Sequence, residues 1–251
     1  MIWEITNEPA NRSGTVAWEQ AVADYVRSYQ SSKGYLTQLV GITGCYPEGN
    51  QDSYNTAINA TNADWSAPAA NYGGSAFQSG NPAAASGDRV RIIDADHVFG
   101  EGGDMSWVWK MFARGYGGVW YMDDLAGSGL PGYPSSSSVL GTEVSARAGM
   151  KAFASVLPSI DLTTMTPQNS LSTTTYCLAD TTNGQFVVLA PSGGAFTVNL
   201  SSMSGKTLAA TWININGGAT SAGGNVPGGN AAQSFTAPTN PAALLLLAGA
   251  P

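Results

Sequence analysis

The rhythm of the chain changes once along its 251 residues, and this change constrains the fold more than any other feature. Residues 1–157 alternate strand-like and helix-like segments, which is typical of right-handed β-α-β units around a parallel sheet. Residues 171–251 contain short strand-like runs separated by Gly-Gly, Asn-Gly and Pro turns. The sequence therefore predicts a parallel β/α region over 1–157, a linker over 158–170 and an antiparallel β-sandwich over 171–251.

The first region supplies the segments of a β/α architecture. Ile2–Thr6 is expected to be a strand, and a helix is expected over Thr15–Ser32. The apolar face of that helix should carry Trp18, Val22, Tyr25, Val26 and Tyr29. Further strands are expected in "LTQLVGITGCY", "NADWSAPA", "DRVRIIDADH" and "GVWYMDD". Further helices are expected in "GGDMSWVWKMFARGYGG", with Asp104 as the N-cap, and in "GTEVSARAGMKAFASVL".

The second region reads as strands alone. The expected strands are "TTTYCLAD", "GQFVVLAP", "AFTVNLS", "LAATWINI", "AQSFTA" and "PAALLLLAG", whereas "GGNVPGG" reads as a loop. The run "AALLLLAG" is too short to span a bilayer. Cys45 and Cys177 lie far apart in the sequence and are expected to be unpaired thiols.

Charge excludes two classes of partner. Only 11% of the residues are charged, and the net charge is −7. Nucleic acids and anionic membranes both require a basic surface, so neither is an expected partner. The first nine residues carry Glu4 and Glu8 and no basic cluster, so they do not form a signal peptide.

Polar and aromatic residues follow the predicted strands, at the ends where the active face of a β/α barrel lies. These residues are Asn7 and Glu8, then Tyr46 and Glu48, then Asp94, Asp96 and His97, and finally Asp123 and Asp124. Trp65 is expected at the same rim. Two carboxyl groups flanked by aromatic rings are what the cleavage of a glycosidic bond requires.

The motif "WEITNEP" resembles the Asn-Glu-Pro signature of retaining glycoside hydrolases with (β/α)8 barrels. In these enzymes the motif closes the fourth strand, and its glutamate is the general acid/base. The segment "IIDADHVFGEGGD" resembles the seventh-strand end of apiosidase-like glycoside hydrolases, with Asp96 in the place of the nucleophile. The β tail resembles a C-terminal domain labelled as collagen-binding. The resemblance implies a retaining glycosidase in which Glu8 is the acid/base.

The nucleophile is left open between two carboxylates. Asp94 and Asp96 share a face if the strand is regular, whereas His97 points to the other face. Aspartate replaces the glutamate usual at this position, so the separation of the two carboxyl groups could depart from about 5–5.5 Å. Either aspartate could instead cap a helix or form an ion pair, and Glu8 could be a solvated turn residue.

The remaining site residues are assigned to substrate binding. Trp3, Asn7, Tyr46, Trp65, His97, Trp120 and Asp123 are the expected substrate-binding set. Trp107, Trp109 and Phe112 are expected in the core. The single histidine excludes a multi-histidine metal site, and neither a metal nor a cofactor is expected. Two other functions stay open: a non-catalytic carbohydrate- or matrix-binding protein, and an esterase-like hydrolase.

The length of the first region predicts its completeness. A full barrel takes about 250 residues, or roughly 30 for each β/α unit. Residues 1–157 have room for about five units. Together with this length, the resemblance implies a partial β/α barrel over 1–157 that corresponds to strands four to eight, as from a truncated gene or environmental DNA. An open barrel exposes an unpaired strand edge and apolar faces. We therefore expect self-association, most simply as a homodimer.

Overall fold

The structure is a computed structural model, and it describes residues 2–45, 51–70, 75–77, 79–86, 88–93, 106–117, 148, 150–152, 154–155 and 157–249. The chain forms two compact units. The β/α unit comprises Met1–Pro82, Asp88–Asp104 and Tyr116–Asp124, and the β unit comprises Ala83–Gly87, Met105–Gly115 and Leu125–Pro251. The prediction of a parallel β/α region followed by an antiparallel β domain is confirmed.

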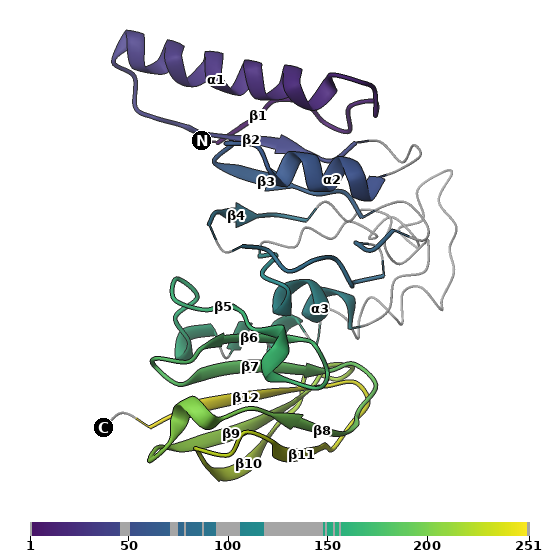
Figure 1. The fold of residues 1–251 in the computed structure, drawn as a ribbon, viewed down its shortest axis with the longest axis vertical. Coiled ribbons are helices and arrows are strands. Elements are labelled where there is room, and N and C mark those ends of the chain that lie inside the picture. The colour runs from purple at the N-terminus through teal and green to yellow at the C-terminus, as the bar shows by residue number, and fades with distance from the viewer. Residues whose placement is uncertain are drawn as a thin grey trace. The chain divides into compact units, whose positions relative to one another are not determined.

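The β/α unit is built on a parallel sheet with the strand order β1-β2-β3-β4. Its strands are β1 (Ile2–Glu4), β2 (Leu39–Thr43), β3 (Trp65–Ala67) and β4 (Val90–Arg91). Two helices, α1 (Thr15–Lys33) and α2 (Gln51–Asn59), connect β1 to β2 and β2 to β3 (Figure 1). Neighbours in sequence are therefore neighbours in the sheet, which is the order of a barrel segment.

Helix α1 has the predicted bounds to within one residue, but it buries a different face from the predicted one. Its buried residues are Glu19, Ala23 and Gln30, and Val16 packs against the cluster formed by Ile42, Cys45, Tyr54, Ile58 and Ala63. Trp18, Tyr25 and Tyr29 are exposed. The aromatic stripe has the spacing of a buried face, but the helix turns a neighbouring stripe toward the sheet.

Helix α2 is formed by residues Gln51–Asn59, which are mostly polar and to which the sequence analysis assigned no element. Two of its side chains make buried hydrogen bonds to distant residues. Tyr54 donates to Glu19 across 2.8 Å, and the Asn55 amide bonds both the N–H and the carbonyl of Ala69. Tertiary contacts therefore stabilise a helix that local sequence does not indicate.

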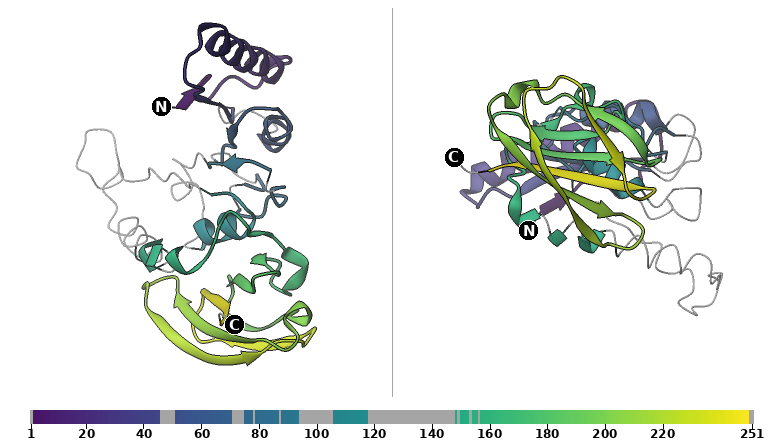
Figure 2. Two further views of the ribbon diagram at one scale, coloured as in Figure 1. Left: turned by 90° about the vertical axis from the view of Figure 1, so that its left-hand side faces the viewer. Right: turned by 90° about the horizontal axis from the view of Figure 1, so that it is seen from below.

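The β unit contains a six-stranded antiparallel sheet, order β10-β9-β12-β7-β6-β5, and the two-stranded ribbon β11-β8. The curvature of these strands is visible in Figure 2. The strands are β5 (Thr166–Pro167), β6 (Cys177–Asp180), β7 (Gln185–Ala190), β8 (Gly194–Val198), β9 (Thr207–Asn214), β10 (Thr220–Pro227), β11 (Gln233–Ala237) and β12 (Ala242–Ala248). Short 3-10 helices occur at Leu157–Ser159, Asn169–Leu171 and Ser201–Met203.

The central strands of the large sheet are buried on both faces. On β7 and β12, Phe186, Val188, Leu244 and Leu246 pack toward the β8 side, into one apolar cluster with Phe196 and Val198. The alternate residues Val187, Leu189, Ala243 and Leu245 pack on the opposite face with Trp109. Because both faces are covered, the runs "FVVLA" and "AALLLL" need no polar alternation.

Helix α3 (Trp107–Ala113) covers this second face and belongs to the β unit, although the sequence grouped it with the β/α region. The expectation that Trp107 and Trp109 are core residues is confirmed, since they are 0% and 3% exposed. Ser106 precedes the helix as its N-cap; the predicted cap, Asp104, lies outside the described residues.

Three further details correct or confirm the sequence analysis. Strand β10 includes glycines that were read as a loop, and β5 lies inside the predicted linker. Cys45 and Cys177 are buried and are not joined by a disulfide, as expected, and burial raises the pKa of Cys177 to about 12. Within the described residues, no helix combines the length and apolar character that a membrane span requires.

Candidate active site

The carboxyl ends of the parallel strands form the edge at which a β/α barrel carries its active site. Hydrogen bonds continue between the segments that leave these strands: Ile5 N–H donates to Gly41 O (3.2 Å), and Gly44 N–H donates to Ala67 O (2.6 Å). The Thr43 hydroxyl donates to Thr6 O (2.6 Å). The residues that follow β1 and β2 therefore meet at one edge of the sheet.

Asn7 and Glu8 lie at this edge, in the loop between β1 and α1. Asn7 is exposed and Glu8 is half-buried. Glu8 has a φ of 44°, in the left-handed region that non-glycine residues seldom adopt. Such a conformation costs roughly 1–3 kcal/mol and persists only where surrounding contacts determine it. The backbone at the candidate acid/base is therefore held in an uncommon conformation.

A buried carboxylate that the sequence analysis did not select lies beside this loop. Glu19 is 0% exposed, and its two oxygens accept hydrogen bonds from the Thr6 hydroxyl (2.6 Å) and from the Tyr54 hydroxyl (2.8 Å). Burial raises the pKa of Glu19, and the two hydrogen bonds offset part of this effect. Burial and the Glu19 carboxylate raise the pKa of Tyr54. The aromatic periodicity of α1 drew attention away from this face.

The two predicted tryptophans occupy different environments. Trp3 lies in β1 and is 45% exposed. Trp65 begins β3 and is 6% exposed, so it does not lie at the carboxyl-end rim where the sequence analysis expected it. Its ring covers Gly41 of β2, where an added Cβ would lie 1.9 Å from the Trp65 ring. Gly41 thus makes room for the indole against the sheet. The substrate-binding role assigned to Trp65 stays a prediction.

The other predicted site residues lie outside the described residues. They are Tyr46, Glu48, Asp94, Asp96, His97, Trp120, Asp123 and Asp124. Two of these segments directly follow described residues. Cys45, after β2, is the residue before Tyr46, and Ile93, after β4, is the residue before Asp94.

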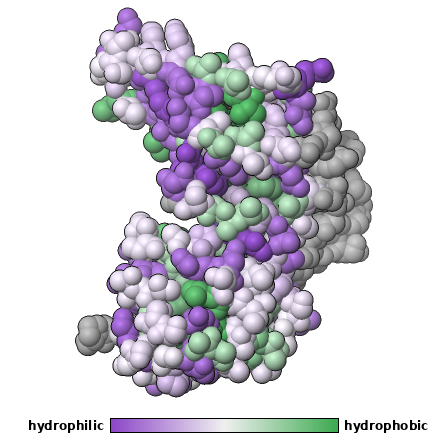
Figure 3. All heavy atoms as spheres, in the orientation of Figure 1, coloured by the Kyte–Doolittle hydropathy of each residue, from purple (hydrophilic) through white to green (hydrophobic). Residues whose placement is uncertain are grey.

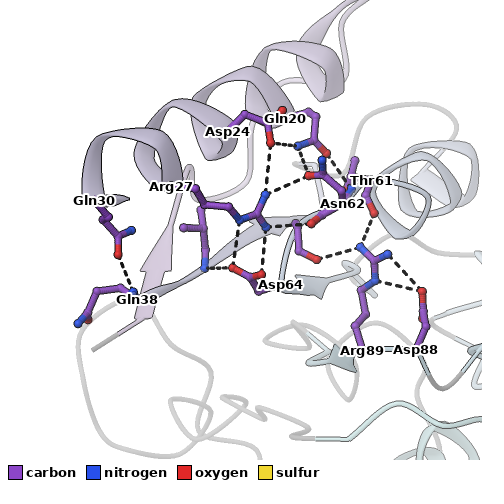
Figure 4. Close-up of polar contacts among 12 residues, drawn as sticks. Gln20, Asp24, Arg27, Gln30, Gln38, Thr61, Asn62, Asp64, Asp88 and Arg89 are labelled. Atoms are coloured by element: carbon purple, nitrogen blue, oxygen red, sulfur yellow. Dashed lines mark hydrogen bonds and ion pairs between the residues drawn. The ribbon is translucent and has the colours of Figure 1, made fainter. Parts of the chain in front are cut away.

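A polar network occupies the opposite, amino-terminal edge of the same sheet (Figure 4). Asp64, immediately before β3, accepts the Val40 N–H (2.8 Å) and forms an ion pair with Arg27 of α1 (3.2 Å). Arg27 also donates to Asn62 O (2.8 Å), and Arg89, before β4, donates to the carbonyls of Thr61 and Ala63. Each contact ties a helix or loop to the start of a strand, so we interpret this network as structural.

Metal ligation finds no support in the described part of the chain. Among those residues, no group of three or more His, Cys, Asp or Glu side chains could hold a metal ion. The chemistry available at the described edge is that of a glutamate in a constrained loop, beside a hydrogen-bonded buried carboxylate.

Comparison with known proteins gives a fold likeness and a partial family match. Residues 162–245 match the family model described as "Putative collagen-binding domain of a collagenase". A solved structure described as a glycoside hydrolase has a TM-score of 0.63 at 13% identity. The alignment covers 98% of this chain and 64% of the chain of that structure. A glycoside hydrolase family 5 structure from Bacteroides vulgatus has a TM-score of 0.64 at 14% identity. The alignment covers 98% of this chain and 61% of the chain of that structure. No curated protein sequence matches the chain.

The chain therefore spans less than two thirds of the length of these structures. At identities of 13% and 14% the likeness establishes the fold alone. The chain has a glycoside-hydrolase-like fold over nearly its whole length, and its C-terminal residues match a family model described as collagen-binding.

Proposed function

We propose that the chain is a retaining glycoside hydrolase in which Glu8 is the general acid/base. The observation that carries this proposal is the location of Glu8, in a constrained loop at the carboxyl end of β1, within a sheet whose fold is that of glycoside hydrolases. The carboxyl ends of parallel strands are where barrel enzymes keep their catalytic groups. The sequence motif "TNEP" adds the chemistry that the fold alone does not supply.

The mechanism needs two carboxyl groups with different duties. Glu8 donates its proton to the leaving oxygen while Asp96 attacks the anomeric carbon and forms a glycosyl-enzyme. The Glu8 carboxylate then removes a proton from water, which displaces Asp96 from the sugar. Asp94 is the alternative nucleophile. The substrate-binding set of this proposal is Trp3, Asn7, Tyr46, His97, Trp120 and Asp123.

The first test replaces Glu8 by glutamine, which keeps the shape of the side chain and removes the proton. We expect Glu8→Gln to lose at least about 10²-fold in kcat on glycosides with poor leaving groups. Aryl glycosides with activated leaving groups need little protonation and should lose less. Asp24→Asn is the control, because it makes the same change of charge on an exposed part of α1. Full activity of Glu8→Gln on a poor leaving group would refute the assignment.

The second test identifies the nucleophile. Asp96→Gly should be inactive and should regain turnover with azide or formate, giving a glycosyl product of inverted anomeric configuration. Rescue of Asp94→Gly instead would transfer the role to Asp94. Absence of rescue in both variants would contradict the retaining mechanism.

A binding function is the second candidate, and the family match over residues 162–245 favours it. In this case the β unit would bind a matrix protein or polysaccharide without turnover. Retention of the full chain on immobilised collagen or polysaccharide, equal for wild type and Glu8→Gln, would support it. A parallel panel of nitrophenyl glycosides and esters separates this function from glycosidase and esterase activity.

We also propose self-association through the β/α unit. β1 ends the strand order of the described parallel sheet, and the same unit exposes large apolar side chains, including Leu36 (86%), Tyr25 (68%) and Trp18 (53%). Figure 3 shows hydrophobic side chains at the surface of this unit beside strongly hydrophilic ones. A two-fold interface over this surface should bury roughly 2,000 Å² or more in total.

Light scattering during gel filtration tests this proposal. At low micromolar concentration we expect the mass of two chains, and we expect Trp18→Ser with Tyr25→Ser to shift the mass toward one chain. Leu162→Ser is the matched control, because Leu162 is 45% exposed in the β unit. A stable wild-type monomer would refute self-association.

A further inference from the structure

The loop that carries Glu8 is fastened to helix α1 at two points. Before Glu8, the Thr6 hydroxyl donates to Glu19 Oε1 (2.6 Å). After Glu8, the Thr15 hydroxyl donates to Ala10 O (3.0 Å). Thr15 and Glu19 are four residues apart, so they lie one turn from each other on the same side of the helix. One face of α1 therefore holds both ends of the five-residue segment from Thr6 to Ala10, whose central residue is Glu8.

The anchor at Thr6 is itself fixed from several directions. Tyr54 of α2 is 4% exposed and donates its hydroxyl to the second oxygen of Glu19 (2.8 Å). Thr43, at the end of β2, donates its hydroxyl to Thr6 O (2.6 Å). Two helices and a neighbouring strand thus converge on the residue that lies two positions before Glu8.

A buried carboxylate is a costly way to fill space. Within the described residues, Glu19 forms no ion pair, and its only described hydrogen-bond donors are two hydroxyl groups. Well-packed apolar groups commonly stabilise a protein as much as buried charge does, or more. Carboxylate hydrogen bonds are, however, short and directional, as the 2.6 Å contact to Thr6 illustrates. The property that an apolar residue could not reproduce is the fixed position of Thr6.

We propose that Glu19 is a positioning residue, which acts through Thr6 and together with Thr15 to hold the Glu8 carboxyl where the glycosidic oxygen is protonated. This inference rests on the proposed glycosidase function. A general acid must be held within about 0.5 Å of its productive position, and displacement by about 1 Å can cost 10²-fold in rate. The left-handed φ of Glu8 agrees with a loop whose conformation is imposed by its anchors.

The test breaks the anchor without touching Glu8. Thr6→Val removes the donated hydroxyl and keeps the side-chain shape, Thr6→Ser restores the hydroxyl, and Glu19→Gln removes the charge. Gln30→Ala is the matched control: Gln30 is 6% exposed on the same face of α1, but its side chain accepts the Gln38 N–H at the amino-terminal edge of the sheet. The free energy of unfolding is measured for every variant.

We expect Thr6→Val and Glu19→Gln to lower kcat by about 10- to 10²-fold on poor leaving groups, with KM changed by less than about twofold. Activated leaving groups should be much less affected, and Thr6→Ser should recover most of the lost rate. Gln30→Ala should keep the wild-type kcat even if it is less stable. Amide hydrogen exchange in a peptide spanning residues 5–14 should accelerate in Thr6→Val and Glu19→Gln but not in Gln30→Ala.

Each contrary result has a distinct meaning. If Thr6→Val, Glu19→Gln and Gln30→Ala all lose kcat in proportion to their losses of stability, the positioning role is overturned and Glu19 is a structural group. A 10²-fold loss in Glu8→Gln beside an unaffected Thr6→Val would overturn the positioning role alone. A fully active Glu8→Gln would overturn the proposed function and the positioning role together.

Discussion

The two units of the chain are stabilised in different ways. In the β unit, β7 and β12 are apolar on both faces, and two clusters of buried side chains enclose the large sheet. In the β/α unit the described strands are two to five residues long, and polar side chains join the helices to the sheet at both edges. Of the ten large apolar side chains exposed among the described residues, nine belong to the β/α unit and one, Leu162, to the β unit.

The unit with the larger apolar core is not the unit that carries the candidate acid/base. The β unit buries its apolar runs within itself, which is typical of a self-contained domain. The β/α unit carries the candidate acid/base and leaves apolar side chains exposed, and directional polar contacts join its helices to its sheet. The following predictions test this contrast by changing one unit at a time.

The largest expected effect is in the core of the β unit. Phe186 is 0% exposed in β7, and Phe186→Ala should lower the free energy of unfolding of this unit by about 3–5 kcal/mol. Trp18→Ala, on the exposed face of α1, should change the stability of the β/α unit by no more than about 0.5 kcal/mol in the monomer. Denaturant unfolding with separate probes for the two units measures both effects. Equal losses of stability in Phe186→Ala and Trp18→Ala would show that Trp18 is packed in solution, and the two units would then not differ in this respect.

A smaller effect is expected in the polar network of the β/α unit. Arg27→Met removes the ion pair with Asp64 and the bond to Asn62 O while keeping an apolar stem, and should cost about 1–2 kcal/mol. Lys33→Met, at the end of the same helix, removes a cation–π contact with Tyr29 and should cost about 0.5 kcal/mol. High salt should reduce the difference between the stability losses of the two variants, because it screens partly exposed charges. If Arg27→Met loses no more free energy of unfolding than Lys33→Met, the polar network does not contribute to the stability of the β/α unit.

The smallest expected effect is the loss of stability of the β unit at low pH. Asp180 is the last residue of β6, and its burial alone would raise its pKa, but hydrogen bonds from Thr164, Asn183 and Thr182 outweigh this and lower the pKa to about 2. A lowered carboxyl pKa adds stability above its ordinary value of 3.8, and this stability is lost as the pH falls toward 2. Asp180→Asn should therefore be less stable than wild type at pH 6, by about 1 kcal/mol or less, and equal to it near pH 2.

Glu19 should respond with the opposite sign. Burial raises its pKa above the ordinary value, so the folded β/α unit binds the proton more tightly than the unfolded chain does. Its ionised form destabilises the folded state, and this cost disappears as the pH falls through the raised pKa toward the ordinary value. Thermal unfolding from pH 7 to 4, wild type against Glu19→Gln, measures this change. A difference that does not vary with pH would contradict the raised pKa.

Local sequence determined much of the secondary structure. The period-3.6 spacing and Gly34 define α1, and the apolar runs between turns define β7 and β12, because these signals depend on backbone and side-chain preferences of neighbouring residues. The motif "TNEP" selected Glu8 and Asn7, which lie at the carboxyl edge of β1. Tyr46, Asp94, Asp96, His97, Trp120 and Asp123 were chosen mainly because they lie at or near the ends of predicted strands, and they remain predictions.

Only the tertiary structure decided which surfaces are buried. The aromatic stripe of α1 and the stripe of Glu19, Ala23 and Gln30 are both continuous along the helix, and the sheet selected the second. Helix α2 and strand β10 lack strong local signals. Hydrogen bonds to Glu19 and Ala69 stabilise α2, and pairing with the preceding strand β9 stabilises β10. Thr6, Glu19 and Tyr54 converge only after β1, α1 and α2 have packed. Side-chain spacing reveals which faces a helix offers, whereas burial and hydrogen bonding depend on the neighbours that the fold brings to them.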